Sequence, residues 1–213
     1  MAIIKVQKGT KDILPPEMPL WHFMETKANE VFTKFGAKEI RTPIFEATEL
    51  FARGVGDTTD IVNKEMYTFE KSERSLTLRP ENTAGVVRSF IENGMHRLAA
   101  PVKLWYKGPM FRYERPQAGR QRQFHQVGVE VFGIKQATAD AEVILMAVNY
   151  LKALGLNDLS VELNSLGCPE CREEFKKKLK SVIKPYLSEL CPDCQARYEK
   201  NPLRLLDCKV EEC

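Results

Sequence analysis

The sequence predicts an α+β fold in which helices flank a largely antiparallel sheet, followed by a mainly helical region that contains the cysteines. Two segments with the period-two alternation of strands, residues 102–114 and 123–132, are joined by a short arginine-rich loop, as in a hairpin. Residues 17–35 and 138–154 carry apolar side chains at helical spacing. All six cysteines lie at or after Cys168, where the composition changes. Together these observations favour an α+β domain with a smaller appendage.

The elements follow one another in an order that suits this class. The helix over 17–35 ends at Gly36, and residues 38–46 read as a strand that Pro43 interrupts, because proline cannot donate to a ladder. Residues 50–64 have the composition of a loop. We then expect, in order, a hairpin over 66–79, a helix opening at Pro80, the two long strands, the helix over 138–154 and a further strand over 159–164.

Length and composition limit the organisation and the partners. A chain of 213 residues suits one large domain with a small appendage, and we place the boundary so that the domains cover 1–166 and 167–213. The net charge of +3 is too small to indicate nucleic acid, so an anion site must come from local clustering. No apolar run approaches the ~20 residues that span a bilayer, and the short apolar start lacks the features of a signal peptide. We therefore expect a cytoplasmic protein without a membrane partner.

Residues 111–126 read FRYERPQAGRQRQFHQ, with four arginines at the mouth of the predicted hairpin. The planar guanidinium matches phosphate and carboxylate bidentately, and Phe124 is available to stack on a planar ring. These features predict a nucleotide site. A solvated sheet face with a polar loop is the alternative.

The period of two divides the second strand of this hairpin into two faces. The face with the valines is the expected core side, and His125, which shares it, is expected to be a core histidine. The glycine on the other face allows something to lie close to the backbone. That face carries Phe124, Gln126, Gly128 and Glu130.

The cysteines form two C-x₂-C pairs, Cys168–Cys171 and Cys191–Cys194, at a spacing expected of a structural zinc site. Residues 169–190 have helical periodicity, however, and a continuous helix of ~30 Å would keep the pairs apart. If Pro185 reverses the chain, the two pairs meet around one Zn²⁺. If it does not, Cys191 and Cys194 join Cys208 and Cys213 instead, and reduced thiols without metal are the remaining possibility.

Five separated segments resemble, in order, the histidyl-tRNA synthetase family of the class II aminoacyl-tRNA synthetases. The segments are KGTKDILPPE, RTPIFE, LTLRPENTAG, LWYKGPMFRYERPQAGRQRQFHQVGVEVFG and NPLRLLDCK. This resemblance covers nearly the whole chain. It implies that residues 1–166 are the first part of a class II synthetase catalytic core and that 167–213 are a truncated insertion near the tRNA acceptor arm. The segment around Pro43 implies a homodimer interface, although a simple edge-strand breaker is by itself the commoner explanation of such a proline.

The resemblance also implies a function, histidine–tRNA ligase. Such an enzyme activates histidine with ATP as histidyl-adenylate, with Mg²⁺ at the phosphates, and transfers the histidyl group to tRNA(His). Arg112 would be the catalytic residue, because it would hold both the α-phosphate and the histidine carboxylate. The other implied ATP residues are Glu114, Arg120 and Phe124, and the other implied histidine residues are Glu81, Thr83, Gln126 and Glu130. Glu81 has a second explanation, since an acidic residue favours a helix N-terminus in any protein.

Two further interpretations stand beside the ligase. The family's third motif, second histidine-recognition loop and anticodon-binding domain do not follow within the 213 residues, so we expect an N-terminal portion whose catalysis in isolation is in doubt. The alternative is the non-catalytic, synthetase-like regulatory subunit of the first enzyme of histidine biosynthesis. The full set of arginines at 112, 115, 120 and 122 favours the ligase, because a regulator does not need the ATP contacts. A plain zinc-stabilised interaction domain would leave these arginines without a purpose.

Overall fold

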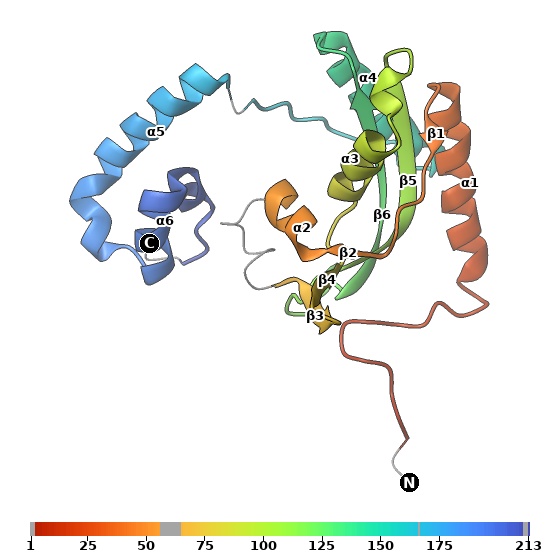
Figure 1. Ribbon diagram of the computed structural model, residues 1–213, viewed down its shortest axis with the longest axis horizontal. Coiled ribbons are helices and arrows are strands. Elements are labelled where there is room, and N and C mark those ends of the chain that lie inside the picture. The colour runs from red at the N-terminus through yellow and green to blue at the C-terminus, as the bar shows by residue number, and fades with distance from the viewer. Residues whose placement is uncertain (1–2, 56–64, 166, 211–212) are drawn as a thin grey trace. The chain divides into compact units, whose positions relative to one another are not determined.

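The computed structural model describes residues 3–55, 65–165, 167–210 and 213. It divides into two compact units, Met1–Leu159 and Ser160–Cys213. The first unit contains two three-stranded sheets with helices packed on them, so the predicted α+β class is confirmed (Figure 1). The domain boundary near residue 167 stays a prediction. Among the residues that the structure describes, every helix is too short or too polar to cross a lipid bilayer.

The larger sheet has the order β1-β5-β6 and contains the predicted long hairpin. Strand β5 (Val102–Phe111) pairs antiparallel with β6 (Gln123–Phe132) and parallel with the short β1 (Lys38–Glu39). The register sets Leu104 opposite Glu130 and Gly108 opposite Gln126. Residues separated by an even number of positions along a strand point to the same side, so Gln126 and Glu130 share a face, as the period of two predicts. Their partners Gly108 and Leu104 point to that side too, because directly opposed residues share a face.

One face of this sheet is covered by α1 (Met18–Lys34) and α4 (Ala137–Ala153), which are the two helices predicted over 17–35 and 138–154. Aromatic packing joins the layers, with the ring centroid of Phe32 lying 5.6 Å from Trp105 and 5.4 Å from Tyr150. Gly36 ends α1 with a φ of 77°, a left-handed conformation that favours glycine. The buried cluster of this layer is Ala28, Phe32, Ala37, Trp105 and Met146.

The opposite face is also a core face, and there α3 (Thr83–Glu92) covers β5 and β6. Figure 1 shows α1 and α3 on opposite sides of the long hairpin. Phe90 of α3 stacks on Phe132 of β6 with centroids 4.1 Å apart, and the turn η2 (Met95–Arg97) follows the helix. The buried residues are Val86, Leu104, Tyr106 and Met110. The valine face packs as expected, through Val129, and the opposite face packs as well, because helices cover both.

The smaller sheet has the order β2-β4-β3, with β2 (Phe45–Ala47), β4 (Arg74–Leu78) and β3 (Tyr67–Lys71). It contains the predicted hairpin over 66–79. The strand predicted over 38–46 is two short strands in different sheets, and Pro43 lies between them. Helix α2 (Thr48–Val55) replaces the first part of the loop predicted over 50–64, because Phe51 is fully buried and anchors it; residues 56–64 lie outside the described part.

Arg79 joins the two sheets. Its backbone amide donates to Ile44 O at 2.8 Å, and its carbonyl accepts from Phe111 N at 3.0 Å. The side chain is 5% exposed and donates to Pro109 O at 2.9 Å and Thr42 O at 3.0 Å. Burial lowers the pKa of this guanidinium. Since these bonds satisfy backbone carbonyls in the interior, Arg79 fixes how β4 meets β5.

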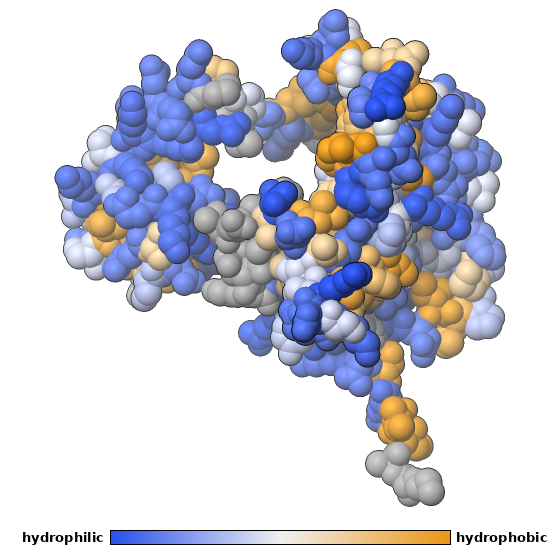
Figure 2. Space-filling view, viewed as in Figure 1, coloured by the Kyte–Doolittle hydropathy of each residue, from blue (hydrophilic) through white to orange (hydrophobic). Residues whose placement is uncertain are grey.

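The second unit is helical throughout its described elements. They are α5 (Pro169–Ile183), η3 (Lys184–Glu189), α6 (Pro192–Lys200) and η4 (Pro202–Asp207). The α-helix ends before Pro185, which removes a backbone donor, and continues as a tighter helix. The strand predicted over 159–164 does not form: these residues have no ladder partner, and Leu163 is 77% exposed. Figure 2 shows a mainly hydrophilic visible surface over this unit.

Candidate functional site

The first group of predicted site residues gathers around Arg112, just beyond the end of β5. The Arg112 guanidinium lies over the Phe124 ring at 5.2 Å from the centroid, and its Nε donates to Pro80 O at 2.9 Å. A terminal nitrogen lies 3.8 Å from a Glu114 carboxylate oxygen. The side chain is thus oriented by an aromatic ring, a backbone carbonyl and a carboxylate, and keeps the rest of its fork free to meet an anion.

Glu114 sits between several arginines of the loop. Its carboxylate accepts from Arg120 at 3.3 Å and is largely buried, whereas the Arg120 side chain is 64% exposed. Arg122 donates through Nε to Glu114 O at 3.2 Å and lies 4.0 Å above the Tyr113 ring. Arg120 therefore stands at the open edge of the group, while Arg122 supports the hairpin from inside.

The N-terminal segment supports the base of the same hairpin. Gly9 O accepts from Arg122 N at 2.7 Å and from Gln123 N at 3.1 Å. A side chain on Gly9 would meet the Arg122 side chain at 2.8 Å, so only glycine allows this approach. Neither Arg122 nor Gly9 was among the predicted site residues. Arg122 was noticed as one of the arginines of the loop, whereas Gly9 lies outside the segments in which strand periodicity was found.

The second group contains Glu81, Thr83 and Glu130. Glu81 accepts from the backbone amides of Thr83 and Ala84, at 3.0 Å for Ala84, and so caps the first turn of α3. Thr83 Oγ1 donates to Glu130 Oε1 at 2.7 Å. The two carboxylates thus lie on either side of one threonine, which is an arrangement suited to a cationic ligand. Glu81 does stabilise a helix N-terminus, as one of its two explanations predicted. A role of Glu81 in ligand binding stays a prediction.

Tyr106 is a member of this second group that the sequence reasoning missed. Its hydroxyl donates to Glu130 Oε1 at 3.5 Å, the long end of a hydrogen bond. Burial, followed by the Glu130 charge, raises the pKa of Tyr106 to about 12, so the phenol stays protonated and can donate. The sequence alone did not indicate this role, because the pairing of Tyr106 with Gly128 depends on the strand register.

Burial also raises the pKa of Glu130, and the nearby Glu81 charge adds to the effect, while the hydrogen bonds from Thr83 and Tyr106 oppose it. An acidic side chain in this position gains by meeting a positive charge or an N–H donor. A donor or cation placed beside Glu130 would therefore offset the cost of its ionised form.

The sequence suggested that Gly128 leaves room for a ligand, but that room is already filled. A Cβ at Gly128 would lie 2.4 Å from Tyr106 ring atoms, so the tyrosine fills the space beside the glycine. The prediction that something lies close to this backbone is right, but the neighbour is a side chain of the protein itself. The close approach is what allows Tyr106 to reach Glu130.

His125 is not a core histidine. It is exposed, its ring packs edge-on against Trp21 at 4.5 Å, and partial burial lowers its pKa. It lines a cavity of about 750 Å³ together with Gln126, Trp21 and Lys107. The lining does not include Glu81, Thr83, Arg112 or Glu130, so of the predicted histidine residues Gln126 alone reaches this cavity.

The two groups meet at one peptide. Arg112 of the first group donates to the carbonyl of Pro80, and Glu81 of the second group is the next residue. The structure therefore brings Arg112, Glu114, Arg120 and Phe124 to one end of a site and Glu81, Thr83 and Glu130 to the other. Such a site offers positive charge at one end and negative charge at the other.

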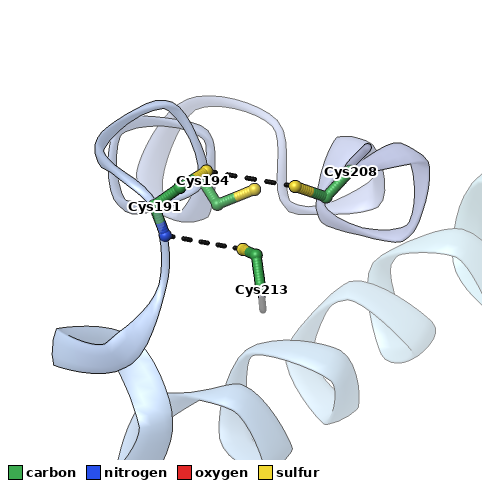
Figure 3. A group of neighbouring side chains, drawn as sticks. All are labelled: Cys191, Cys194, Cys208 and Cys213. Carbon is green, nitrogen blue, oxygen red and sulfur yellow. Dashed lines mark hydrogen bonds between the residues drawn. The ribbon is translucent and has the colours of Figure 1, made fainter. Parts of the chain in front are cut away.

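The cysteines form two separate arrangements. Cys168 and Cys171 are exposed, with their sulfurs 3.0 Å apart at the start of α5. The remaining four gather at the other end of the unit, with all Sγ atoms within 4.8 Å of one another: Cys191, Cys194, Cys208 and Cys213 (Figure 3). The sulfurs that gather are those of the alternative set, whereas Cys168 and Cys171 lie at the start of α5 and are not part of this group. Which cysteines bind a metal stays a prediction.

The fold is of the aminoacyl-tRNA synthetase type. The chain superposes with a TM-score of 0.78 on the crystal structure of the apo S. aureus histidyl-tRNA synthetase, at 43% identity, over 95% of this chain and 48% of that one. An ATP phosphoribosyltransferase regulatory subunit/histidyl-tRNA synthetase from Bacillus halodurans shares the fold at 23% identity, with a TM-score of 0.67, over 89% of this chain and 52% of that one.

The sequence comparison is more specific. The sequence model of the Histidyl-tRNA synthetase family matches residues 9–170. The chain belongs to the histidyl-tRNA synthetase family. The histidine–tRNA ligase of Desulforamulus reducens is 59% identical over 207 residues, which cover 97% of this chain and 49% of that relative. The chain thus spans about half the length of the curated relatives it matches.

Proposed function

We propose that this chain provides the ATP- and histidine-binding part of a histidine–tRNA ligase. The observation that carries the proposal is the Arg112–Pro80 hydrogen bond, which sets the arginine group beside Glu81. ATP and histidine have to meet at the α-phosphate, so their binding groups must adjoin. A site with arginines at one end and carboxylates at the other suits a triphosphate placed next to an amino acid.

We assign the roles at the ATP end by charge and position. Arg112 is the catalytic residue, because its guanidinium can neutralise both the α-phosphate and the histidine carboxylate as negative charge develops. Glu114 and the exposed Arg120 contact the nucleotide, and Phe124 stacks on the adenine ring. Mg²⁺, when bound, would reduce the charge of the phosphates.

At the histidine end the ligand carries an ammonium group and an imidazole. Glu81, Thr83 and Gln126 are assigned to the ammonium, and Glu130 accepts from a ring N–H of the imidazole. The Thr83 and Tyr106 hydroxyls hold the Glu130 carboxylate in place for this contact. The raised pKa of Glu130 supports this role, since a buried carboxylate gains more from an added donor than a solvated one.

The remaining assignments rest on family membership. We propose that tRNA(His) is the acceptor, that the protein is a cytoplasmic homodimer, and that residues 1–166 are the first part of the catalytic core. Residues 167–213 would then be an insertion toward the tRNA. Zn²⁺ is the second metal that we propose, because cysteine thiolates are its preferred ligands.

The rival function is the regulatory subunit of the first enzyme of histidine biosynthesis. The Bacillus halodurans protein that carries both names shares the fold only, at 23% identity. The arginine group at residues 112–122 supports the ligase, because its geometry is suited to a triphosphate that a regulator does not consume.

The test uses a chimaera in which this chain replaces the matching half of the Desulforamulus reducens ligase. We expect histidine-dependent exchange of pyrophosphate into ATP. Replacing Arg112 by alanine should lower the exchange rate by about 10²–10³-fold, the usual effect of losing one preorganised charge-stabilising donor. Arg97→Ala, which removes an exposed arginine on η2, is the matched control and should leave the rate unchanged.

Two outcomes would count against the proposal. A folded chimaera that binds histidine but shows no exchange would favour the regulatory function. Exchange that persists at the parent rate in Arg112→Ala would remove the role of this arginine. Circular dichroism of each variant shows whether a loss of activity reflects a loss of fold.

A further inference from the structure

The second unit has very little apolar interior of its own. Its buried cluster consists of Cys194, Tyr198 and Leu205, and the other residues packed against it include three more cysteines. Large apolar side chains of its helices are exposed, among them Val182 at 60% and Leu206 at 63%. A buried cluster of this size contributes little stability, so an additional stabilising element among these helices would have a large effect.

The cysteines stand at the centre of this unit. Cys191 is the N-cap of α6 and Cys194 lies in its first turn, while Cys208 directly follows η4. The Cys213 amide donates to Val210 O at 3.1 Å. The four sulfurs therefore come from two short segments with C-x₂-C and C-x₄-C spacing, within the C-x₂₋₄-C range of structural zinc sites.

The distances fit a tetrahedron of thiolates rather than a disulfide. Cys191 Sγ and Cys208 Sγ are 3.9 Å apart. A Zn–S bond of ~2.3 Å gives a tetrahedral S···S edge of ~3.8 Å, whereas a disulfide requires ~2.05 Å. All four sulfurs also lie within 4.8 Å of one another, which a pairwise bond does not explain.

Backbone amides around the cluster favour negative sulfurs. Val210 N donates to Cys208 Sγ at 3.4 Å, and Cys191 N donates to Cys213 Sγ at 3.5 Å (Figure 3 draws the second). Such donors orient thiolate ligands and offset the charge of four of them around one divalent cation.

We propose that one structural Zn²⁺ is bound by four thiolates of the second unit: Cys191, Cys194, Cys208 and Cys213. The metal takes the place of the missing apolar core and ties α6 to the segment that follows η4. Cys168 and Cys171 take no part, since they pair with each other at the start of α5. This inference stands apart from the ligase activity, because metal binding is measured without histidine, ATP or tRNA.

The first experiment measures zinc by mass spectrometry in the 213-residue chain purified without added metal. We expect about one zinc per chain, as for a closed four-cysteine site. The paired variants Cys194→Ser/Cys208→Ser and Cys168→Ser/Cys171→Ser remove the same number of thiols. The first should lose the metal, and the second should keep it. Less than about a tenth of an equivalent in the parent chain, or equal loss in both variants, overturns the proposal.

A second measurement needs no substitution and therefore does not depend on whether a variant folds. The native chain is alkylated and each cysteine is scored by mass spectrometry, before and after zinc is removed with a chelator. We expect Cys168 and Cys171 to react at once and the other four to react only after chelation. Protection of Cys168 and Cys171 together with Cys191 and Cys194 would instead identify the other four-cysteine set and refute the proposed one.

Discussion

The neighbours of Glu130 determine both the position and the pKa of its carboxylate. The strand register places it beside Tyr106, and α3 brings Thr83 to within 2.7 Å of its carboxylate. These contacts satisfy one oxygen, while burial and the Glu81 charge make the ionised form costly. In such a site the protein gives up stability so that an incoming donor or cation gains binding energy.

Glu130→Gln should therefore raise stability and weaken histidine binding. Because the folded-state pKa of Glu130 is raised, its stabilising contribution is present below the ordinary carboxyl pKa and is lost as the pH rises through the folded-state pKa. The glutamine stays neutral, so the free energy of unfolding should exceed that of the parent above that pKa and approach it at lower pH. Urea denaturation across pH measures the difference.

Histidine binding gives the second part of this prediction. Calorimetric titration of the chimaera with histidine should show affinity that falls as the pH drops through the raised pKa, because protonated Glu130 no longer attracts the ligand. Glu130→Gln should lose this pH dependence. Glu70→Gln on β3 removes an exposed carboxylate and should change neither measurement. A variant less stable than the parent at all pH values would contradict the account.

At the scale of elements, local patterns predicted most of what forms. The helices over 17–35 and 138–154 and both hairpins appear within a few residues of their expected bounds, because apolar periodicity and turn residues specify them locally. Helix α2 is short and amphipathic, and it was missed because the glycines at 54 and 56 gave its segment the composition of a loop. The strand over 159–164 does not form because a strand needs a neighbour, and a sequence pattern cannot supply one.

The candidate site likewise contains residues that the sequence identified and contacts that only the structure shows. Arg112 and Phe124 were identifiable from residue type within the arginine-rich hairpin, whereas Glu81 and Thr83 came from the resemblance of their segment to the family. The contact between Tyr106 and Gly128 depends on the strand register, and the joining of Cys208 and Cys213 to Cys191 and Cys194 depends on where α5 ends. Both are long-range relationships, for which one sequence offers alternatives but no choice between them.

Gly128→Ala tests the pairing of β5 with β6. The added methyl group would lie 2.4 Å from the Tyr106 ring, so the ring must move away from Glu130. We expect a loss of about 1–3 kcal/mol in the free energy of unfolding, as for other overpacked interiors, together with weaker histidine binding. Denaturant unfolding measures the first effect and calorimetry the second.

A double-mutant cycle supplies the control for this prediction. Tyr106→Leu shortens the side chain, so adding Gly128→Ala in that background should cost much less than it does in the parent. Equal costs in the two backgrounds would mean that the glycine is required for another reason.

At the scale of the whole molecule, the interior of each unit is stabilised by different interactions. The first unit has two apolar clusters on opposite faces of one sheet, and Arg79 connects that sheet to the smaller one. The second unit has helices around a cysteine cluster. A unit with its own large core keeps its structure when conditions change locally, whereas a unit built around a metal depends on that metal.

Removal of zinc should therefore unfold the second unit and leave the first unit folded. Both tryptophans, Trp21 and Trp105, belong to the first unit, so near-ultraviolet dichroism and fluorescence of tryptophan report on that unit alone. Far-ultraviolet dichroism includes the helices of both. On chelation we expect helical signal to fall while the tryptophan signals stay constant, and both to return to their starting values when zinc is restored. The Cys168→Ser/Cys171→Ser chain should behave identically. If helicity is unchanged after the metal has been shown to leave, the second unit is stabilised by its side-chain packing, and zinc is not a folding element of this protein.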